Sequence, residues 1–275
     1  MSQLDHSTSN ICTYWLPGEL LYWLNLPSYP PVWSRLCERN AVNIKRYINE
    51  SKLCAYDVEI PGELWSLWGC LHPSNQIFSY KTRGKQTLGC NLIACCATKL
   101  YPLLHWTPRL LDSIVISGDR YYRQSLNNLN TDEHNISLED LNCNCKLENI
   151  SFKVRTEIVA YGALYEKDLS SRRNLAKGLI YFFSKNNICI LRCRQRSLAI
   201  GRDNGKCGGD YFMYDCQSME YPLFQKGEGV PYLLRCRTLQ MLFYCLVMAL
   251  EVRCNRVQFT IHTVNIRYKG TMDAE

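Results

Sequence analysis

A glycine-bordered turn leading into a long apolar stretch is the feature of this sequence that most constrains its fold. The turn at Gly84–Gly89 reads GKQTLG, and the apolar stretch that follows extends to Leu104. Apolar residues recur here at a spacing close to four, as on the buried face of a helix. That face comprises Leu88, Leu92, Ile93, Cys96 and Leu100. The spacing therefore predicts a buried helix that begins directly at the turn.

The remainder of the chain predicts a second helix followed by an antiparallel sheet. Thr107 can cap a helix whose first position is Pro108, because proline lacks only a donor that is unused there. Further helices are expected at 178–183 and from Gly229-Val230-Pro231 to about Leu250. Strands are expected at 188–194, 197–201, 211–215 and 257–264, the first two of them paired. Helices first and strands afterwards is the order of an α+β fold.

The glycine-bordered turn resembles a known catalytic segment. In the deubiquitinase domains of herpesvirus large tegument proteins and their relatives in mobile elements, a Gly-x-Gln-Cys run opens the helix that carries the nucleophile. Here Gly84–Leu92 reads GKQTLGCNL, so that Thr87 stands at the cysteine position.

A second segment resembles the Phe-Asp-x-His strand that supplies the general base and its orienting carboxylate in those domains. Tyr211–Ser218 reads YFMYDCQS, with Asp215 at the acid position and Gln217 at the histidine position. Gln76, in the run SNQIF, lies about where the resemblance places an oxyanion-stabilising glutamine. We expect Thr87 to begin the buried helix, with Asp215 and Gln217 on a facing strand.

A third resemblance covers residues that have no catalytic role. Trp106–Tyr122 reads WTPRLLDSIVISGDRYY, which is similar to the helix that follows the nucleophile helix in the same domains. It supports a shared fold independently of the catalytic positions. The resemblance implies a papain-like cysteine-peptidase architecture, with helices packed on a central antiparallel sheet, over about residues 71–265.

The residues at the catalytic positions predict an inactive enzyme. A cysteine protease needs a thiolate, a histidine within hydrogen-bond reach and a group that orients the histidine. Thr87 offers an unactivated hydroxyl, and Gln217 cannot accept and deliver a proton near pH 7. A rearranged dyad is the alternative: Cys90 lies one helical turn beyond Thr87, and His72 or His262 could approach the cleft. Cys216 is expected on the opposite face of its strand from Asp215.

Composition and net charge exclude only a few classes of binding partner. The 275 residues carry a net charge of +7 with Lys and Arg spread along the chain, which favours an ordinary solvated surface over a nucleic-acid site. The N-terminus has no secretory signal, so the 16 cysteines are expected to be reduced thiols in a cytoplasmic or nuclear protein. The chain has no Cys-x-x-Cys pair and no apolar run of about 20 residues. No metal, cofactor or membrane is therefore expected, with structural zinc as the alternative.

Residues 1–70 form a predicted aromatic-rich extension ahead of a domain at 71–275. Two similar runs, PGELLYW at Pro17–Trp23 and PGELWSLW at Pro61–Trp68, predict short helices. The extension holds five of the six tryptophans: Trp15, Trp23, Trp33, Trp65 and Trp68. Because tryptophan dominates interface hot spots, these five are the candidate protein-binding residues.

Three functional hypotheses follow. The first is a pseudo-deubiquitinase that serves as a protein-binding or scaffold module, for a ubiquitin-like protein or a second copy of the chain. The second is an active cysteine hydrolase with a relocated dyad. The third is a basic nucleic-acid or chromatin adaptor.

Overall fold

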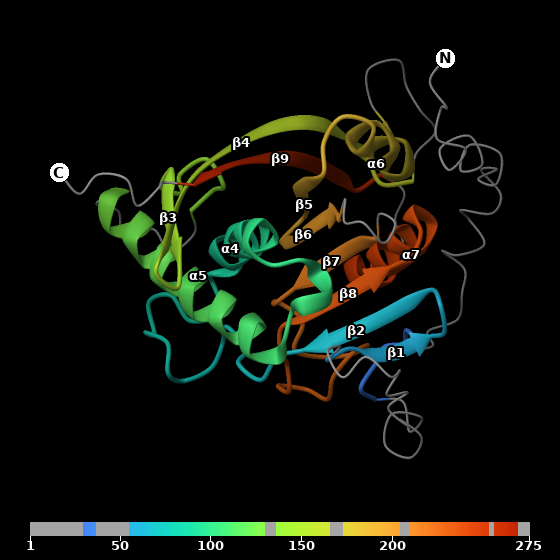
Figure 1. Ribbon diagram of the computed structural model, residues 1–275, viewed down its shortest axis with the longest axis horizontal. Coiled ribbons are helices and arrows are strands. Elements are labelled where there is room, and N and C mark those ends of the chain that lie inside the picture. Colours follow the sequence, from blue (N-terminus) through green and yellow to red (C-terminus); the bar gives the residue numbers. More distant parts are fainter. Residues whose placement is uncertain are drawn as a thin grey trace.

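A single antiparallel sheet runs through the protein (Figure 1). The computed structural model describes residues 30–36, 55–129, 136–165, 173–203, 210–252 and 256–268. Within these ranges nine strands pair in the order β1-β2-β8-β7-β6-β5-β9-β4-β3. The strands are β1 (Asp57–Ile60), β2 (Leu64–Trp68), β3 (Asn144–Leu147), β4 (Ile150–Ala163), β5 (Ile188–Cys193), β6 (Arg196–Arg202), β7 (Tyr211–Asp215), β8 (Tyr232–Cys236) and β9 (Gln258–Tyr268).

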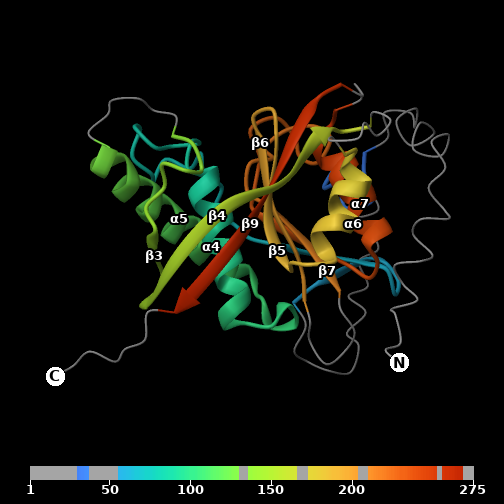
Figure 2. The same cartoon turned by 90° about the horizontal axis from the view of Figure 1, so that it is seen from above.

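Helices cover both faces of this sheet (Figure 2). The described helices are α4 (Thr87–Leu100), a 3-10 turn η1 (Leu103–His105), α5 (Pro108–Leu129), α6 (Leu175–Phe183) and α7 (Leu239–Leu250). None of them is both long enough and apolar enough to cross a membrane. The helix expected at the glycine-bordered turn begins at Thr87, and the amide of Leu110 donates to the Thr107 hydroxyl, as predicted for the cap of α5.

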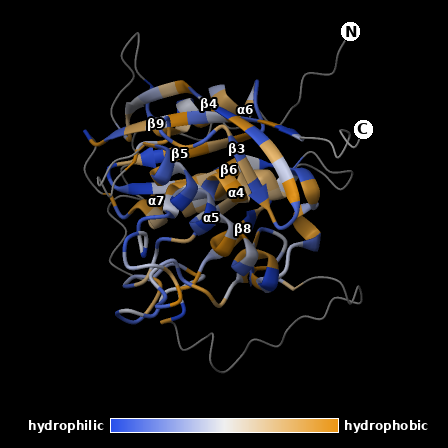
Figure 3. Ribbon diagram, turned by 90° about the vertical axis from the view of Figure 1, so that its left-hand side faces the viewer, coloured by the Kyte–Doolittle hydropathy of each residue, from blue (hydrophilic) through white to orange (hydrophobic). Residues whose placement is uncertain are grey.

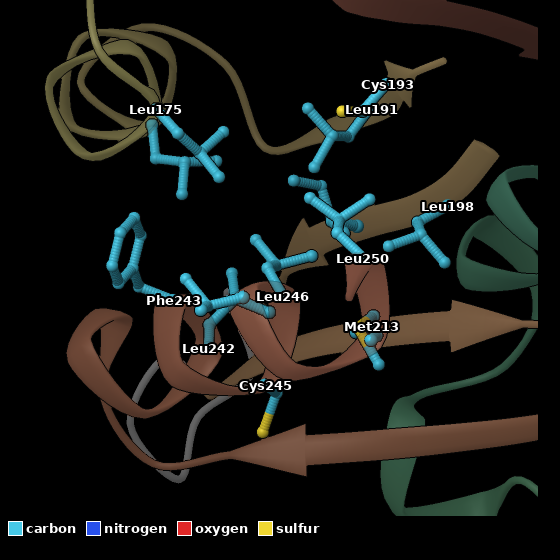
Figure 4. Packing of buried hydrophobic residues seen from close by; sticks show 14 of the residues in the cluster. Leu175, Leu191, Cys193, Leu198, Met213, Leu242, Phe243, Cys245, Leu246 and Leu250 are labelled. Carbon is cyan, nitrogen blue, oxygen red and sulfur yellow. The ribbon is translucent and has the colours of Figure 1, made fainter. Parts of the chain in front are cut away.

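The central strands bury alternate residues in two separate cores. Cys189 and Leu191 of β5 pack in the core under α6 and α7, whereas Ile190 between them packs in the core under α4 and α5. Successive side chains of a strand point to opposite faces, so a strand covered on both sides is apolar throughout. Figure 4 shows the first core, in which Leu242 and Leu246 of α7 gather with the strand side chains.

The two helices beside the glycine-bordered turn differ in how they are buried. Helix α4 buries every residue from Gly89 to Ala97, while α5 alternates buried and exposed positions along its length. Figure 3 colours both helices by the hydropathy of their residues. The helices touch at two glycines. A β-carbon on Gly118 would lie 2.6 Å from the α-carbon of Cys90, and one on Gly89 would lie 2.6 Å from the carbonyl oxygen of Gly118. This contact fixes α4 against α5.

Two sequence predictions of helices are wrong. Pro61–Trp68 forms a β-turn and strand β2, because Gly62 has φ +76° and the amide of Glu63 donates to the carbonyl of Ile60. Proline followed by a left-handed glycine is the pattern of a type II turn, whereas proline followed by glutamate in the sequence also suits the first turn of a helix. The earlier copy of this run, at 17–23, lies outside the described residues.

The other error concerns the segment after Gly229. Tyr232–Cys236 is strand β8, and α7 begins only at Leu239, capped by Thr238, whose hydroxyl accepts from the amide of Met241. The segment YLLRC is almost wholly buried between the two cores. A short apolar run of this kind has no periodicity that separates strand from helix.

The boundary predicted at residue 70 falls inside the architecture of the sheet. Strand β2 pairs with β8 along its full length, from Leu64 opposite Cys236 to Trp68 opposite Tyr232. The β1–β2 hairpin is therefore the edge of the main sheet and is corrected from an extension to a part of the domain. Residues 1–29 and 37–54 lie outside the described ranges.

We predict that Gly118→Ala destabilises the protein by about 1–3 kcal/mol, since the added methyl group meets the backbone of Cys90 and forces α4 and α5 apart. Chemical unfolding measures this. Gly178→Ala in α6 is the matched control, because its β-carbon would meet only side-chain atoms, the Phe259 ring at 3.2 Å and Ile261 Cδ1 at 3.4 Å. Equal effects of the two substitutions would contradict the role given to the α4–α5 contact.

Candidate functional site

Thr87 is the first residue of α4 and is held there by the segment that precedes it. The side chain of Gln86, completely buried, donates from Nε2 to the carbonyl of Pro73 at 2.8 Å. Gly84, with φ +74°, donates its amide to the same carbonyl at 3.0 Å. Because both bonds end on the carbonyl of Pro73, the chain between Pro73 and Gln86 forms a closed loop. This loop places Thr87 at the N-terminus of α4, where its side chain is buried.

Two carboxylates of α5 hold the chain that leads into this turn. Asp112 Oδ1 accepts from the amides of Cys70 at 2.7 Å and Leu71 at 2.9 Å. Asp119 Oδ1 accepts from the hydroxyl of Thr82 at 2.8 Å. Both acids belong to the WTPRLLDSIVISGDRYY run, so this noncatalytic run positions the segment that leads to Thr87.

Asp215, at the end of β7, is a completely buried carboxylate with a full set of donors. Its Oδ2 accepts from Arg196 Nη2 at 2.7 Å, Ser218 Oγ at 2.8 Å and Tyr232 OH at 3.1 Å. Its Oδ1 accepts from the backbone amide of Gln217 at 2.8 Å. The carboxylate thus joins β6, β7 and β8.

Arg196 extends the same cluster to α7. Its Nη2 also reaches Ser218 Oγ at 2.8 Å and the carbonyl of Ala249 at 3.2 Å. Burial lowers the pKa of Arg196, and the negative charge of Asp215, with smaller contributions from other neighbours, more than offsets this. The guanidinium therefore stays charged and neutralises the buried acid.

Gln217 is turned toward the backbone of the β5–β6 turn. Its Nε2 donates to the carbonyl of Gln195 at 3.1 Å, while its Oε1 is buried without a hydrogen-bond partner among the described residues. An amide side chain in this place supplies one donor and one acceptor but takes up no proton near neutral pH.

His72 connects the Thr87 turn to the Gln217 segment. The backbone of Gln217 and Ser218 and the charge of Asp215 lie close enough to its ring to raise the pKa of His72. Its Nε2 nevertheless makes no hydrogen bond within the described chain. His72 also directly precedes Pro73, on which the Gln86 side chain closes. The two sequence motifs therefore meet through His72.

The hydrogen bonds of His72 determine where its proton lies. The amide of Ser74 donates to Nδ1 at 3.1 Å, and the hydroxyl of Ser74 lies 2.7 Å from the same atom. Nδ1 is thus the acceptor, and the proton of the neutral ring is on Nε2. Burial lowers the pKa of His72 despite the raising influence of its neighbours, so the ring is neutral at pH 7.

Cys90 and Cys216 lie together in the core under α4 and α5. The Cys90 thiol lies 3.9 Å from the carbonyl of Val115, and burial, followed by contact with Cys216, raises the pKa of Cys90 well above its usual value. Cys216 packs on the α4 side of the sheet, whereas Asp215 bonds to groups on the α7 side, which confirms the expected alternation. A thiol in this setting is neutral near pH 7.

The other candidates occupy separate places. His262 of β9 lies three strands from β7 and contacts Thr260, so the structure does not bring it to the Thr87 turn. Gln76 is exposed, and its carbonyl accepts from Arg83 Nη2 at 3.1 Å. Within the described residues no cluster of His, Cys, Asp and Glu is arranged to hold a metal ion.

The candidate binding tryptophans separate into three groups. Trp33 is completely buried and packs edge-on against Tyr244, so it is a core residue, which corrects its assignment to a binding surface. Trp65 and Trp68 are half-buried: Arg235 lies over Trp65, and Trp68 stacks on Tyr232 with Arg35 at 3.9 Å from its ring. Trp15 and Trp23 lie outside the described residues.

Residues 72–269 match the family described as herpesvirus tegument protein, N-terminal conserved region. The match covers more than half of the sequence. The chain belongs to this family. A comparison of this tegument-family chain with curated proteins found no match.

A solved structure shares the fold of this tegument-family domain. It is the ubiquitin-specific protease encoded by murine cytomegalovirus tegument protein M48, in complex with a ubiquitin-based suicide substrate. The TM-score is 0.61 at 13% sequence identity, over 75% of this chain and 88% of the M48 chain. The likeness confirms the predicted papain-like α+β architecture.

Sequence reasoning did not find the partners of Asp215 in this tegument-family domain. Arg196, Ser218 and Tyr232 come from three different segments, and their meeting depends on the pairing of β7 with β6 and β8. The one local signal is the Asp-x-x-Ser spacing at Asp215–Ser218, which allows a side-chain bond across a turn.

We predict that Arg196→Met destabilises the protein by about 2–4 kcal/mol, because it leaves the Asp215 carboxylate buried without a counter-charge. We expect a smaller loss of stability than for a fully buried ion pair, because the Arg196 side chain is 22% exposed. Chemical unfolding measures it, with Arg155→Met as the control. Arg155 pairs with Glu157 on the surface and should change the stability by less than about 0.5 kcal/mol. Similar losses for both variants would refute the role of the buried pair.

Proposed function

We propose that this tegument-family domain is a catalytically inactive deubiquitinase-like module that binds a protein partner. The observation that carries the proposal is the composition of the site around Asp215. Thr87 places a hydroxyl at the nucleophile position, and Gln217 places an amide at the base position. Arg196, Ser218 and Tyr232 donate hydrogen bonds to the carboxylate of Asp215. Acyl transfer requires a nucleophile with an adjacent base, and these residues supply neither.

The nearby groups do not provide a substitute pair. His72 carries its proton on Nε2, and its Nδ1 is capped by Ser74, so neither nitrogen is available as a base toward the Thr87 turn. Cys90 is completely buried, and its raised pKa keeps it in the thiol form. This supports inactivity over a relocated Cys90–histidine dyad.

A ubiquitin-like protein is the partner that the comparisons favour. The M48 protease shares the fold and was solved with a ubiquitin-based suicide substrate. A site that keeps the turn at Thr87 and the strand at Asp215, but performs no hydrolysis, would hold such a partner without cleaving it. We propose a cytoplasmic or nuclear setting, where ubiquitin-like proteins are found.

A ubiquitin-based suicide probe tests this proposal. We predict that the full chain forms no covalent adduct by intact mass, under conditions in which the M48 protease domain is fully modified. Calorimetry with unmodified ubiquitin should still detect reversible binding.

Two outcomes would contradict the proposal. An adduct that disappears in Cys90→Ala would establish the relocated dyad. Absence of ubiquitin binding together with salt-sensitive binding to oligo(dT) would favour a nucleic-acid adaptor instead.

A further inference from the structure

Two large apolar side chains stand out on the surface of the segment between His72 and α4. Ile77 is 68% exposed and Tyr80 is 77% exposed, the highest values among the large hydrophobic residues of the described chain. Single apolar residues on a surface need no explanation, whereas two large and strongly exposed ones on one short loop are candidates for a contact with another molecule. We call Ile77, Tyr80, Lys81 and Lys85 the Ile77–Lys85 surface.

The loop that carries this surface is held in one shape. Phe78, between the two exposed side chains, is buried in the core under α4 and α5. Arg83 Nη2 donates to the carbonyls of Phe78 at 2.9 Å and Gln76 at 3.1 Å. The hydroxyl of Thr82 donates to Asp119 of α5. A loop fixed in this way presents Ile77 and Tyr80 with little conformational entropy left to lose on binding.

The charged side chains of the loop itself are all positive. The sequence contains no Asp or Glu between Glu63 and Asp112, while Lys81, Arg83 and Lys85 fall within the loop. The Arg83 guanidinium is occupied by backbone carbonyls. Neither Lys81 nor Lys85 forms an ion pair within the described ranges, and both are at least partly exposed. The loop that carries the apolar pair thus also carries two ammonium groups.

We propose that the Ile77–Lys85 surface docks an acidic peptide segment that carries large apolar side chains. Its apolar residues contact Ile77 and Tyr80, and its carboxylates pair with Lys81 and Lys85, where opposite charges favour association. A nucleic acid fits less well, because Ile77 offers nothing to a phosphate or a base face and the arginine is already engaged. Lys85 belongs to the turn before Thr87, so this surface adjoins the proposed ubiquitin-like site. Peptide binding and ubiquitin binding are measured with different ligands, so the failure of one proposal is distinguishable from the failure of the other.

Fluorescence anisotropy with a labelled peptide that alternates Asp or Glu with Phe and Leu tests the proposal on the full chain. We expect Ile77→Ser/Tyr80→Ser to weaken binding at least about tenfold. Ile158→Ser/Tyr161→Ser is the matched control, because it removes the same two residue types from exposed positions on β4. It should bind as the unchanged protein does. Both variants alter surface residues, and thermal unfolding verifies that each is folded.

Charge reversal supplies the second arm. Lys81→Glu/Lys85→Glu should weaken binding of the acidic peptide about tenfold, and Lys146→Glu/Lys153→Glu, which alters exposed lysines of β3 and β4, should not. The same peptide with Lys in place of its acids should not bind.

Three results would overturn the proposal. One is no detectable binding of the acidic peptide, and another is equal binding by Ile77→Ser/Tyr80→Ser and its control. The third is tighter binding of labelled oligo(dT) than of the peptide, lost in Lys81→Glu/Lys85→Glu, which would assign the surface to nucleic acid.

Discussion

The buried ion pair of Asp215 and Arg196 is the interaction on which the centre of this molecule depends. A carboxylate with no exposed surface is tolerated only when charge and hydrogen bonds compensate for its lost hydration. Arg196, Ser218 and Tyr232 provide that compensation from β6, the turn after β7, and β8. The bond from Arg196 to the carbonyl of Ala249 adds the end of α7. The strand that ends at Asp215 is therefore fixed to three neighbours at once.

Under the proposal of an inactive domain, this arrangement would explain how a peptidase-like site persists without peptidase chemistry. A carboxylate that orients a histidine must be held in place, and the same bonds that hold it also stabilise the fold. If Gln217 stands at the position of a catalytic histidine, as we propose, Asp215 keeps its structural role in this domain. The Thr87 turn is retained for a comparable reason, because Gln86, Pro73 and the α5 acids Asp112 and Asp119 fasten it to the α4–α5 core.

The sequence predicted the parts of the fold that carry local signals. The turn at Gly84–Gly89, the Thr107 cap and the opposite faces of Asp215 and Cys216 each depend on neighbouring residues, and each prediction is confirmed. Strand β8 was misread because its burial on both faces removes the alternation, and the β1–β2 hairpin because Pro61-Gly62 suits a turn and a helix start alike. Trp33 gave no sign of its burial, since that follows from packing against Tyr244 of α7. The donors to Asp215 are likewise set by strand order, which no local pattern encodes.

The central claim is that this domain keeps the structure of the site without its proton-transfer chemistry. The rate at which the full chain hydrolyses a fluorogenic ubiquitin conjugate tests it most directly. The account predicts no turnover above the buffer blank, and the same result for Thr87→Ala and Cys90→Ala. Turnover by the unchanged chain that is abolished by either substitution would contradict it.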